Sequence, residues 1–191
     1  MSYYKYAREQ YEQPKDNLDE IWKSRLQKWR KEGVIERHEN PTRLPKARQK
    51  GYKAKKGFQV YRVRVNKGGT KRRRADGGRK PSKAGQSRYS SKKSKQVIGE
   101  QKVSSEFENL EVLDSYWLAE DGNYKWFEVI TVDPEHPEIQ ADDDINWIAD
   151  NKNRAENGLT PASNKSRGLK NKGKGAEKMR PSGNANDGKN K

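Results

Sequence analysis

The clearest periodic pattern lies between Pro14 and Gly33, where large apolar side chains recur at steps of three and four residues. These side chains are Leu18, Ile21, Trp22, Leu26 and Trp29. Because this spacing places them on one face of a helix, the pattern predicts an amphipathic helix with a buried apolar face. Asn17 followed by Glu20 resembles a capping box at its start, and Gly33 is a stop signal at its end.

A spacing of two residues appears in Phe58–Val65, a run of β-branched and aromatic residues. Tyr61, Val63 and Val65 fall on one face, and Arg62 and Arg64 fall on the other. Such alternation is typical of a strand. Val34 and Ile35, within Gly33–Glu39, indicate another strand.

Two further strands, Glu111–Ala119 and Tyr124–Val132, are predicted on either side of Asp121-Gly122, which is a strong hairpin signal. Their large apolar side chains are Val112, Tyr116, Leu118, Trp126 and Ile130 on one face, and Leu113, Trp117, Phe127 and Val129 on the other. A sheet that is apolar on both faces needs a covering layer on each side. The expected covering helices are the first helix, Gln96–Asn109 and Asp142–Asp150.

These elements predict an α+β fold (an α/β-type small domain): a mixed or antiparallel sheet of about four strands covered by helices, with long basic irregular extensions. Residues 1–65 and 96–150 are expected to form the single globular domain. Residues 66–95 and 151–191 have too few apolar side chains to offset the entropy lost on ordering. We therefore predict a basic internal extension and a basic C-terminal extension.

Charge divides the chain along similar boundaries. The 191 residues include 43 Lys and Arg against 27 Asp and Glu, for a formal charge of +16, and only 29% are hydrophobic. Residues 41–102 hold 22 bases and 2 acids, residues 103–150 hold 1 base and 14 acids, and residues 151–191 hold 11 bases and 3 acids. This composition is unlike that of an ordinary enzyme. A polyanion is the natural counter-surface, and nucleic acid fits better than a membrane.

Several classes of protein are excluded by what the sequence lacks. It has no cysteine, which removes disulfides, thiolate metal sites and a cysteine nucleophile. No apolar run approaches the roughly 20 residues that cross a bilayer, and the first residues do not resemble a signal peptide. We expect a cytoplasmic protein with no membrane partner and no small-molecule substrate.

The segment from Arg43 to Arg74 interleaves bases with glycines and aromatic residues. Glycines let a backbone approach phosphate closely, bases neutralise it, and Tyr52 is a candidate for stacking on an unpaired base. With so few acids in the segment, internal ion pairs are not expected to account for its bases. The alternative is a solvated basic loop or a localisation signal.

RNA is favoured over DNA because no helix-turn-helix, basic zipper or Cys/His finger is present, and irregular basic segments suit threading between RNA helices. The tail from Leu159 to Lys174 has a similar composition and predicts a second RNA-binding extension rather than an unbound tail. The candidate RNA-binding residues are Arg43, Lys46, Arg48, Tyr52, Lys53, Lys55, Lys56, Arg62, Arg64, Lys67, Lys71, Arg72, Arg73, Arg74, Arg79, Arg88, Lys165, Arg167, Lys170, Lys172 and Arg180.

No catalytic site is predicted. Asp142–Asp144 could coordinate a divalent cation, as nuclease carboxylates do, but adjacent acids before an apolar stretch more simply mark a helix N-terminus. His38 and His136, the only histidines, have no ligand partner at a suitable spacing. We therefore expect no metal, no cofactor and no enzymatic activity.

The acidic residues 103–150 leave two interpretations open. They could form a protein-binding face, or a solvent face adapted to high salt, where dense carboxylates hold hydration. In molar salt, Coulomb attraction is screened within about 3 Å. RNA binding under those conditions would depend on contact hydrogen bonds and stacking.

A series of motifs in order along the chain carries a family resemblance. The strongest is Lys46-Ala47-Arg48-x-x-Gly51-Tyr52-Lys53-Ala54-Lys55-x-Gly57-Phe58, continuing through Val60–Val65. The others are Ser115–Leu118 with Glu120-Asp121, Tyr124-Lys125, Phe127–Ile130, Val132–Pro134, Ile145–Ile148, Gly158–Thr160, Ser166–Leu169 and Arg180–Ser182. With these motifs, the chain resembles the archaeal and eukaryotic large-subunit ribosomal protein family numbered fifteen in the eukaryotic series, and within it a halophilic archaeal member.

The resemblance implies a structural constituent of the large ribosomal subunit that binds rRNA through basic loops and extensions, stabilises its tertiary fold and supports translation without catalysis. It also implies neighbouring large-subunit proteins as partners, including the kink-turn-binding protein. Pro45 stands where the family usually has Asp, and Lys50 where it usually has an apolar residue. The alternative from another class is a free RNA chaperone or regulatory RNA-binding protein.

Overall fold

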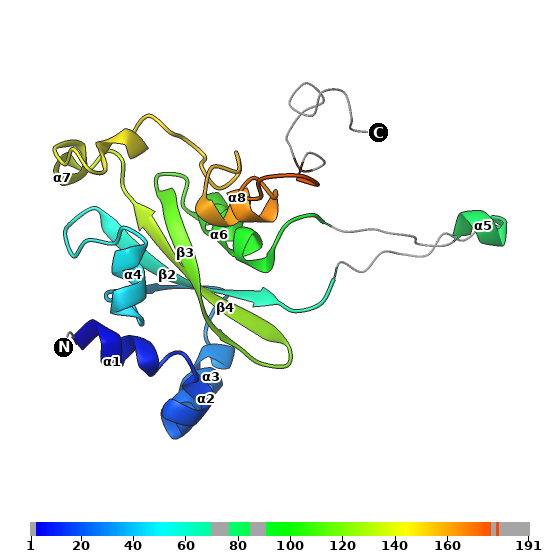
Figure 1. The fold of residues 1–191 in the computed structure, drawn as a ribbon, viewed down its shortest axis with the longest axis horizontal. Helices are drawn as coiled ribbons and strands as arrows, with labels where there is room; N and C mark the ends of the chain where they lie inside the picture. The colour runs from blue at the N-terminus through cyan, green and yellow to red at the C-terminus, as the bar shows by residue number, and fades with distance from the viewer. Residues whose placement is uncertain (1–2, 70–76, 85–90, 177–178, 180–191) are drawn as a thin grey trace.

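The chain folds around one antiparallel sheet with helices on both faces (Figure 1). The computed structural model describes residues 3–69, 77–84, 91–176 and 179. The strands are β1 (Ile35–His38), β2 (Phe58–Asn66), β3 (Glu111–Glu120) and β4 (Tyr124–Val132). The helices are α1 (Tyr3–Glu9), α2 (Pro14–Asn17), α3 (Asp19–Lys31), α4 (Leu44–Gln49), α5 (Pro81–Ala84), α6 (Lys95–Glu106), α7 (Pro137–Gln140), the 3-10 helix η1 (Asn146–Ile148) and α8 (Pro161–Ser166). The predicted α+β class is confirmed.

The four strands lie in the order β1-β2-β4-β3, and each neighbouring pair is antiparallel. The predicted hairpin is β3–β4, in which Tyr116 lies opposite Glu128. On the other side of β4, Arg62 of β2 lies opposite the same glutamate. The strand indicated by Val34 and Ile35 is the short edge strand β1.

The predicted faces of β3 are wrong at its beginning. Leu113 packs in the cluster on the α3 side of the sheet, and Val112 packs in the cluster on the α6 side. The pairing with β4 shifts between Val112 and Asp114. Because one extra residue in a strand reverses the alternation of its side chains, this bulge exchanges the faces of the residues before it.

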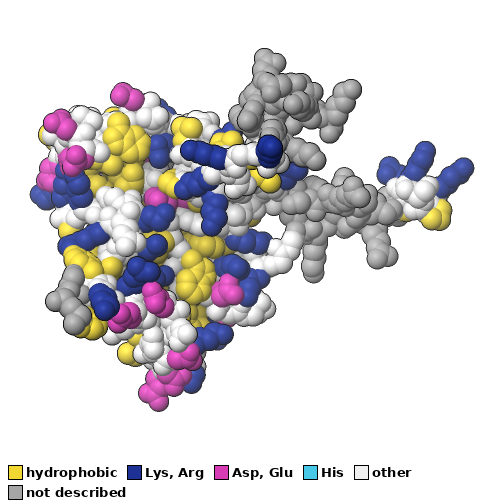
Figure 2. All heavy atoms as spheres, in the orientation of Figure 1, with side chains coloured by type: hydrophobic (Ala, Val, Ile, Leu, Met, Phe, Trp, Pro, Cys, Tyr) yellow, Lys and Arg dark blue, Asp and Glu magenta, His cyan; other side chains and the backbone are white. Residues whose placement is uncertain are grey.

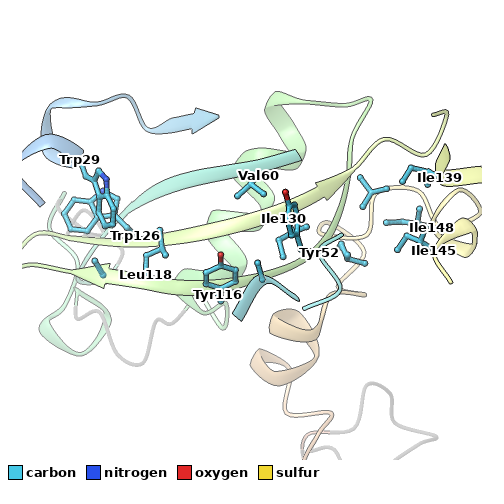
Figure 3. Close-up of a cluster of buried hydrophobic side chains, with 14 of the residues drawn as sticks. Trp29, Tyr52, Val60, Tyr116, Leu118, Trp126, Ile130, Ile139, Ile145 and Ile148 are labelled. Atoms are coloured by element: carbon cyan, nitrogen blue, oxygen red, sulfur yellow. The ribbon is translucent and has the colours of Figure 1, made fainter. Parts of the chain in front are cut away.

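The cluster on the α3 side extends along the whole sheet (Figure 3). Trp29 of α3 and Trp126 of β4 lie at one end, with their ring centroids 6.1 Å apart. Ile139, Ile145 and Ile148 lie at the other end. A second cluster lies under α6 and contains Val63 and Val65 of β2, Val103 of α6 and Phe127 of β4. Both faces of the sheet are therefore covered, as the apolar pattern predicts.

The first predicted helix is confirmed in its body but not at its start. Trp22, Leu26 and Trp29 are buried as expected. Ile21, however, is 54% exposed. The helix breaks at Leu18, so that α3 begins at Asp19, and the side-chain amide of Asn17 donates a hydrogen bond to the carbonyl of Glu9. The predicted capping box is therefore wrong.

The predicted helix Asp142–Asp150 is also wrong, because turns and the single turn η1 occupy this segment. The Asp142 carboxylate accepts a hydrogen bond from the backbone N–H of Asp144 at 3.1 Å. Aspartate side chains that bind nearby backbone groups in this way compete with helical hydrogen bonds. Ile145 and Ile148 are nevertheless buried, so the segment still covers the sheet. The other predicted helix, Gln96–Asn109, is present as α6.

The two predicted extensions differ in their relation to the sheet. Helix α5, within the internal extension, lies far from the sheet (Figure 1), and residues 77–83 are exposed. By contrast, Ala155 and Ala162 in the C-terminal segment are buried, and Ser94, just before α6, donates its backbone N–H to Ser166 of α8. The first part of this segment thus packs on the domain. Among the described residues, no helix combines the length and apolar character that a membrane span requires.

Candidate nucleic-acid interface

Folding pairs part of the basic segment, Arg43–Arg74, with the acidic residues 103–150, which we call the acidic block. The Lys53 ammonium lies 2.9 Å from carboxylate oxygens of both Asp142 and Asp144. Within the described residues, the other pairs of this kind are Lys55 with Asp142, Lys50 with Asp114, and Lys67 with Glu120. The expectation that internal ion pairs would not account for the bases is therefore wrong for these lysines. Their acid partners come from distant segments, which a count along the sequence cannot place.

Two of the predicted RNA-binding residues lie inside the protein. Tyr52 is 8% exposed, and its ring packs edge-on against Phe58 with the centroids 5.9 Å apart. Arg62 is 5% exposed, pairs with Glu32 and lies 4.6 Å from the ring centroid of Trp29. Both side chains make these contacts inside the folded protein. We therefore assign Tyr52 and Arg62 to the core and not to the candidate interface.

Two other predicted arginines are partly exposed and held by the protein. Arg43 donates a hydrogen bond to the carbonyl of Trp117 at 3.2 Å, and burial lowers its pKa. Arg64 donates one to the carbonyl of Arg30 at 2.7 Å. A guanidinium has five N–H donors, so each arginine retains donors for a phosphate.

The remaining predicted bases within the described residues include an exposed set on α4, the extensions and the segment before β2. This set contains Arg48, Lys56, Arg79, Lys165, Arg167, Lys170 and Lys172, and Lys46 is partly exposed. Figure 2 shows basic side chains across the middle of one face, over α4 and toward α8, with acidic side chains near α7 and around α2 and α3. Lys71, Arg72, Arg73, Arg74, Arg88 and Arg180 lie outside the described residues.

Within the described part of residues 77–176, several exposed bases were not among the predicted site residues. They are Lys80, Lys83, Lys92, Lys93, Lys102, Lys152 and Lys174. Most of them belong to the two segments predicted as basic extensions. The sequence feature that could have identified them is therefore the local density of positive charge, and not a motif.

The acidic turn at Asp142 is an ion-pair site. Hydrogen bonds from Lys55 and Lys53 hold the pKa of the Asp142 carboxyl well below its usual range. Within the described part of the chain, no group of three or more His, Asp or Glu residues is arranged to hold a metal ion. The imidazole of His136 accepts a hydrogen bond from the backbone N–H of Glu138 and so caps α7. These contacts give both motifs a structural role.

A buried carboxylate fastens the C-terminal segment to the sheet. Glu100 of α6 is completely buried and accepts hydrogen bonds from the hydroxyls of Ser115 on β3 and Thr160. Thr160 in turn caps α8 by accepting the backbone N–H of Ser163 at 3.3 Å. One side chain thus joins α6, β3 and α8.

Replacing Glu100 with glutamine is expected to change how stability depends on pH. Burial raises the pKa of Glu100 above 4.5, so the folded protein binds this proton more tightly than the unfolded chain does. The contribution of Glu100 to stability therefore falls as pH rises from the unfolded pKa through the folded one, by at most about 1.4 kcal/mol per pH unit. As pH rises through this range, the stability of Glu100→Gln should therefore increase relative to that of wild type.

Urea unfolding of the two proteins at several pH values measures this difference. The matched control is Glu108→Gln, which changes an exposed carboxyl in the loop after α6. The control should keep the pH dependence of wild type. If Glu100→Gln also keeps it, the carboxyl of Glu100 does not titrate in this range and the prediction is wrong.

Comparison with known proteins identifies the family. The family model described as Ribosomal L15 matches residues 2–186. A large ribosomal subunit protein eL15 of Halobacterium salinarum is 50% identical to this chain, and the match covers all of this chain and 98% of the relative. The protein of the same name from Haloarcula marismortui is 48% identical with the same coverage. The chain therefore belongs to the Ribosomal L15 family, whose members are ribosomal proteins and not enzymes.

Proposed function

We propose that this protein is a structural constituent of the large ribosomal subunit that binds rRNA and stabilises its tertiary fold. The observation that carries the proposal is the set of exposed bases that remains after the acidic block has paired with Lys50, Lys53 and Lys55. Such bases neutralise phosphates and release counterions. The names of the relatives, which are large-subunit proteins, support the same assignment.

The proposed phosphate contacts are the exposed bases of α4 and both extensions, together with Arg43 and Arg64. Lys53 and Lys55 are paired with Asp142. Each would therefore contact RNA only by binding a phosphate and Asp142 at the same time. The partners that we propose are large-subunit rRNA and neighbouring large-subunit proteins, including the kink-turn-binding protein that the family resemblance implies. The protein would then be found on cytoplasmic ribosomes.

Removing three bases of the C-terminal segment is expected to weaken the salt dependence of RNA binding. In Lys165→Gln/Lys170→Gln/Lys172→Gln, the slope of log affinity against log salt should fall in magnitude by about 2, because each lost phosphate contact removes about 0.7 to 0.9. The measurement is binding to large-subunit rRNA at a series of KCl concentrations.

The matched control removes the same charge from α2 and α3, at the exposed residues Lys15, Lys23 and Lys28. It should leave the slope nearly unchanged. Equal slopes for the two triple variants would show that only total charge matters and would remove the C-terminal bases from the interface.

Sucrose-gradient sedimentation of cell extract distinguishes the proposed function from the alternative. A ribosomal constituent would sediment with large subunits, whereas a free RNA chaperone would remain mainly outside them.

A further inference from the structure

A groove between α1 and α4 brings aromatic and basic side chains together. Its volume is about 700 Å³, which lies within the range of pockets that hold small organic groups. Tyr4 and Tyr11 line it from the N-terminal segment, and Arg43, Lys46 and Arg48 line it from α4 and the residue before it. Neither the predicted motifs nor the ion pairs described above explain this groove.

Each tyrosine ring of the groove is accompanied by a guanidinium. The Arg43 Cζ lies over the Tyr11 ring, 4.7 Å from its centroid. The Arg48 Cζ lies over the Tyr4 ring, 5.5 Å from its centroid. Aromatic rings and guanidinium planes are the two kinds of surface on which proteins stack unpaired RNA bases.

One side of the groove is held by hydrogen bonds within the protein, and the other is exposed to solvent. The Tyr11 hydroxyl donates a hydrogen bond to the carbonyl of Thr42 at 3.1 Å and accepts one from Arg25 at 3.0 Å. Tyr4 is 38% exposed and Arg48 is exposed. An incoming group would therefore meet the Tyr4 and Arg48 side first, against a rigid Tyr11 wall.

The charge of the lining favours an anion. Four of the lining residues are bases, namely Arg8, Arg43, Lys46 and Arg48, and the acid Glu12 is paired with Arg8 at 3.0 Å. A nucleotide combines a flat base with a phosphate, which matches stacking surfaces next to bases. An acidic peptide would use the charges but not the aromatic walls.

We propose that this groove holds one unstacked nucleotide of rRNA, with its base against Tyr4 and Arg48 and its phosphate beside Lys46. This inference rests on the proposed function, because it names a subsite within the RNA interface. Stacking on an aromatic side chain tolerates any base. The groove is therefore specific for an unpaired nucleotide rather than for a sequence.

The test compares two RNA hairpins that differ only in one bulged nucleotide. The full-length protein should bind the bulged hairpin about tenfold more tightly than the paired one. Tyr4→Ala and Arg48→Gln should each remove most of that preference, and Tyr4→Phe should keep it. The matched controls are Tyr6→Ala and Arg37→Gln, which change exposed residues outside the groove and should also keep the preference.

The possible results separate this subsite from general RNA binding. No preference in the wild-type protein, or a preference that survives in both Tyr4→Ala and Arg48→Gln, overturns the nucleotide subsite even if both hairpins bind. Failure to bind either hairpin or large-subunit rRNA overturns the proposed function itself. A decaglutamate peptide that binds wild type but not Arg48→Gln, with no hairpin preference, assigns the groove to an acidic protein segment instead.

Discussion

Replacing Glu128 with alanine is expected to lower the free energy of unfolding by about 3 to 5 kcal/mol. Glu128 is completely buried on β4. Its carboxylate accepts hydrogen bonds from the Thr42 backbone N–H at 3.0 Å, from the Thr42 hydroxyl at 2.9 Å and from the Tyr116 hydroxyl. Alanine would leave these donors without an acceptor, at a cost of about 1 to 3 kcal/mol for each buried one.

The matched variant is Glu128→Gln, which keeps the volume and a carbonyl oxygen. Burial raises the pKa of Glu128, so the folded protein disfavours its charged form. Losing the charge should therefore cost little, and we expect a loss of no more than about 1.5 kcal/mol. Urea unfolding followed by tryptophan fluorescence gives both values. Equal losses in the two variants would show that the hydrogen bonds to Thr42 and Tyr116 contribute nothing.

Glu128→Ala should also disturb the groove between α1 and α4. Thr42 holds the Tyr11 hydroxyl through its carbonyl and immediately precedes Arg43. When Glu128 no longer holds Thr42, the Tyr11 wall loses its support. Any Glu128→Ala protein that remains folded should therefore show a weaker preference for the bulged hairpin than Glu128→Gln does.

The local sequence pattern was sufficient to predict those elements whose structure is determined by residues close together in the chain. The alternation in Phe58–Val65 and the Asp121-Gly122 turn predicted strands that the sheet contains, because side-chain period and turn chemistry act within a few residues. The bulge at Val112 and the turn at Asp142 could not be predicted in this way. Each depends on a partner from elsewhere in the fold, namely β4 for Val112 and Lys53 for Asp142.

The same distinction applies to the candidate site. Exposed bases such as Lys170 and Lys172 lie in a segment with little apolar surface, so composition alone predicted their exposure. Tyr52 and Arg62 looked similar in sequence but are buried against Phe58 and Trp29. A motif rich in bases and glycines can therefore be partly a core motif. The groove was missed because Tyr4 and Tyr11 carry no charge and lie outside the basic segment.

Replacing Gly57 with alanine is expected to destabilise the fold by about 2 to 5 kcal/mol. Gly57 has a φ of +89°, and a Cβ built there would lie 2.5 Å from Cγ1 and 2.9 Å from Cδ1 of the buried Ile139. The positive φ costs about 1 to 2 kcal/mol for a residue with a Cβ, and overpacking the core adds about 1 to 3 kcal/mol. The melting temperature should fall by about 4 to 20 °C, since 1 kcal/mol corresponds to about 2 to 4 °C at this size.

Gly68→Ala separates the two contributions. Gly68 has a φ of +84°, but nothing lies within 4 Å of the position where its Cβ would be. This control should lose only the conformational part, about 1 to 2 kcal/mol. In the double variant Gly57→Ala/Ile139→Ala, the overlap is gone, so the combined loss should be smaller than the sum of the two single losses. Equal losses for Gly57→Ala and Gly68→Ala, or strict additivity in the double variant, would show that Ile139 does not exclude a side chain at position 57.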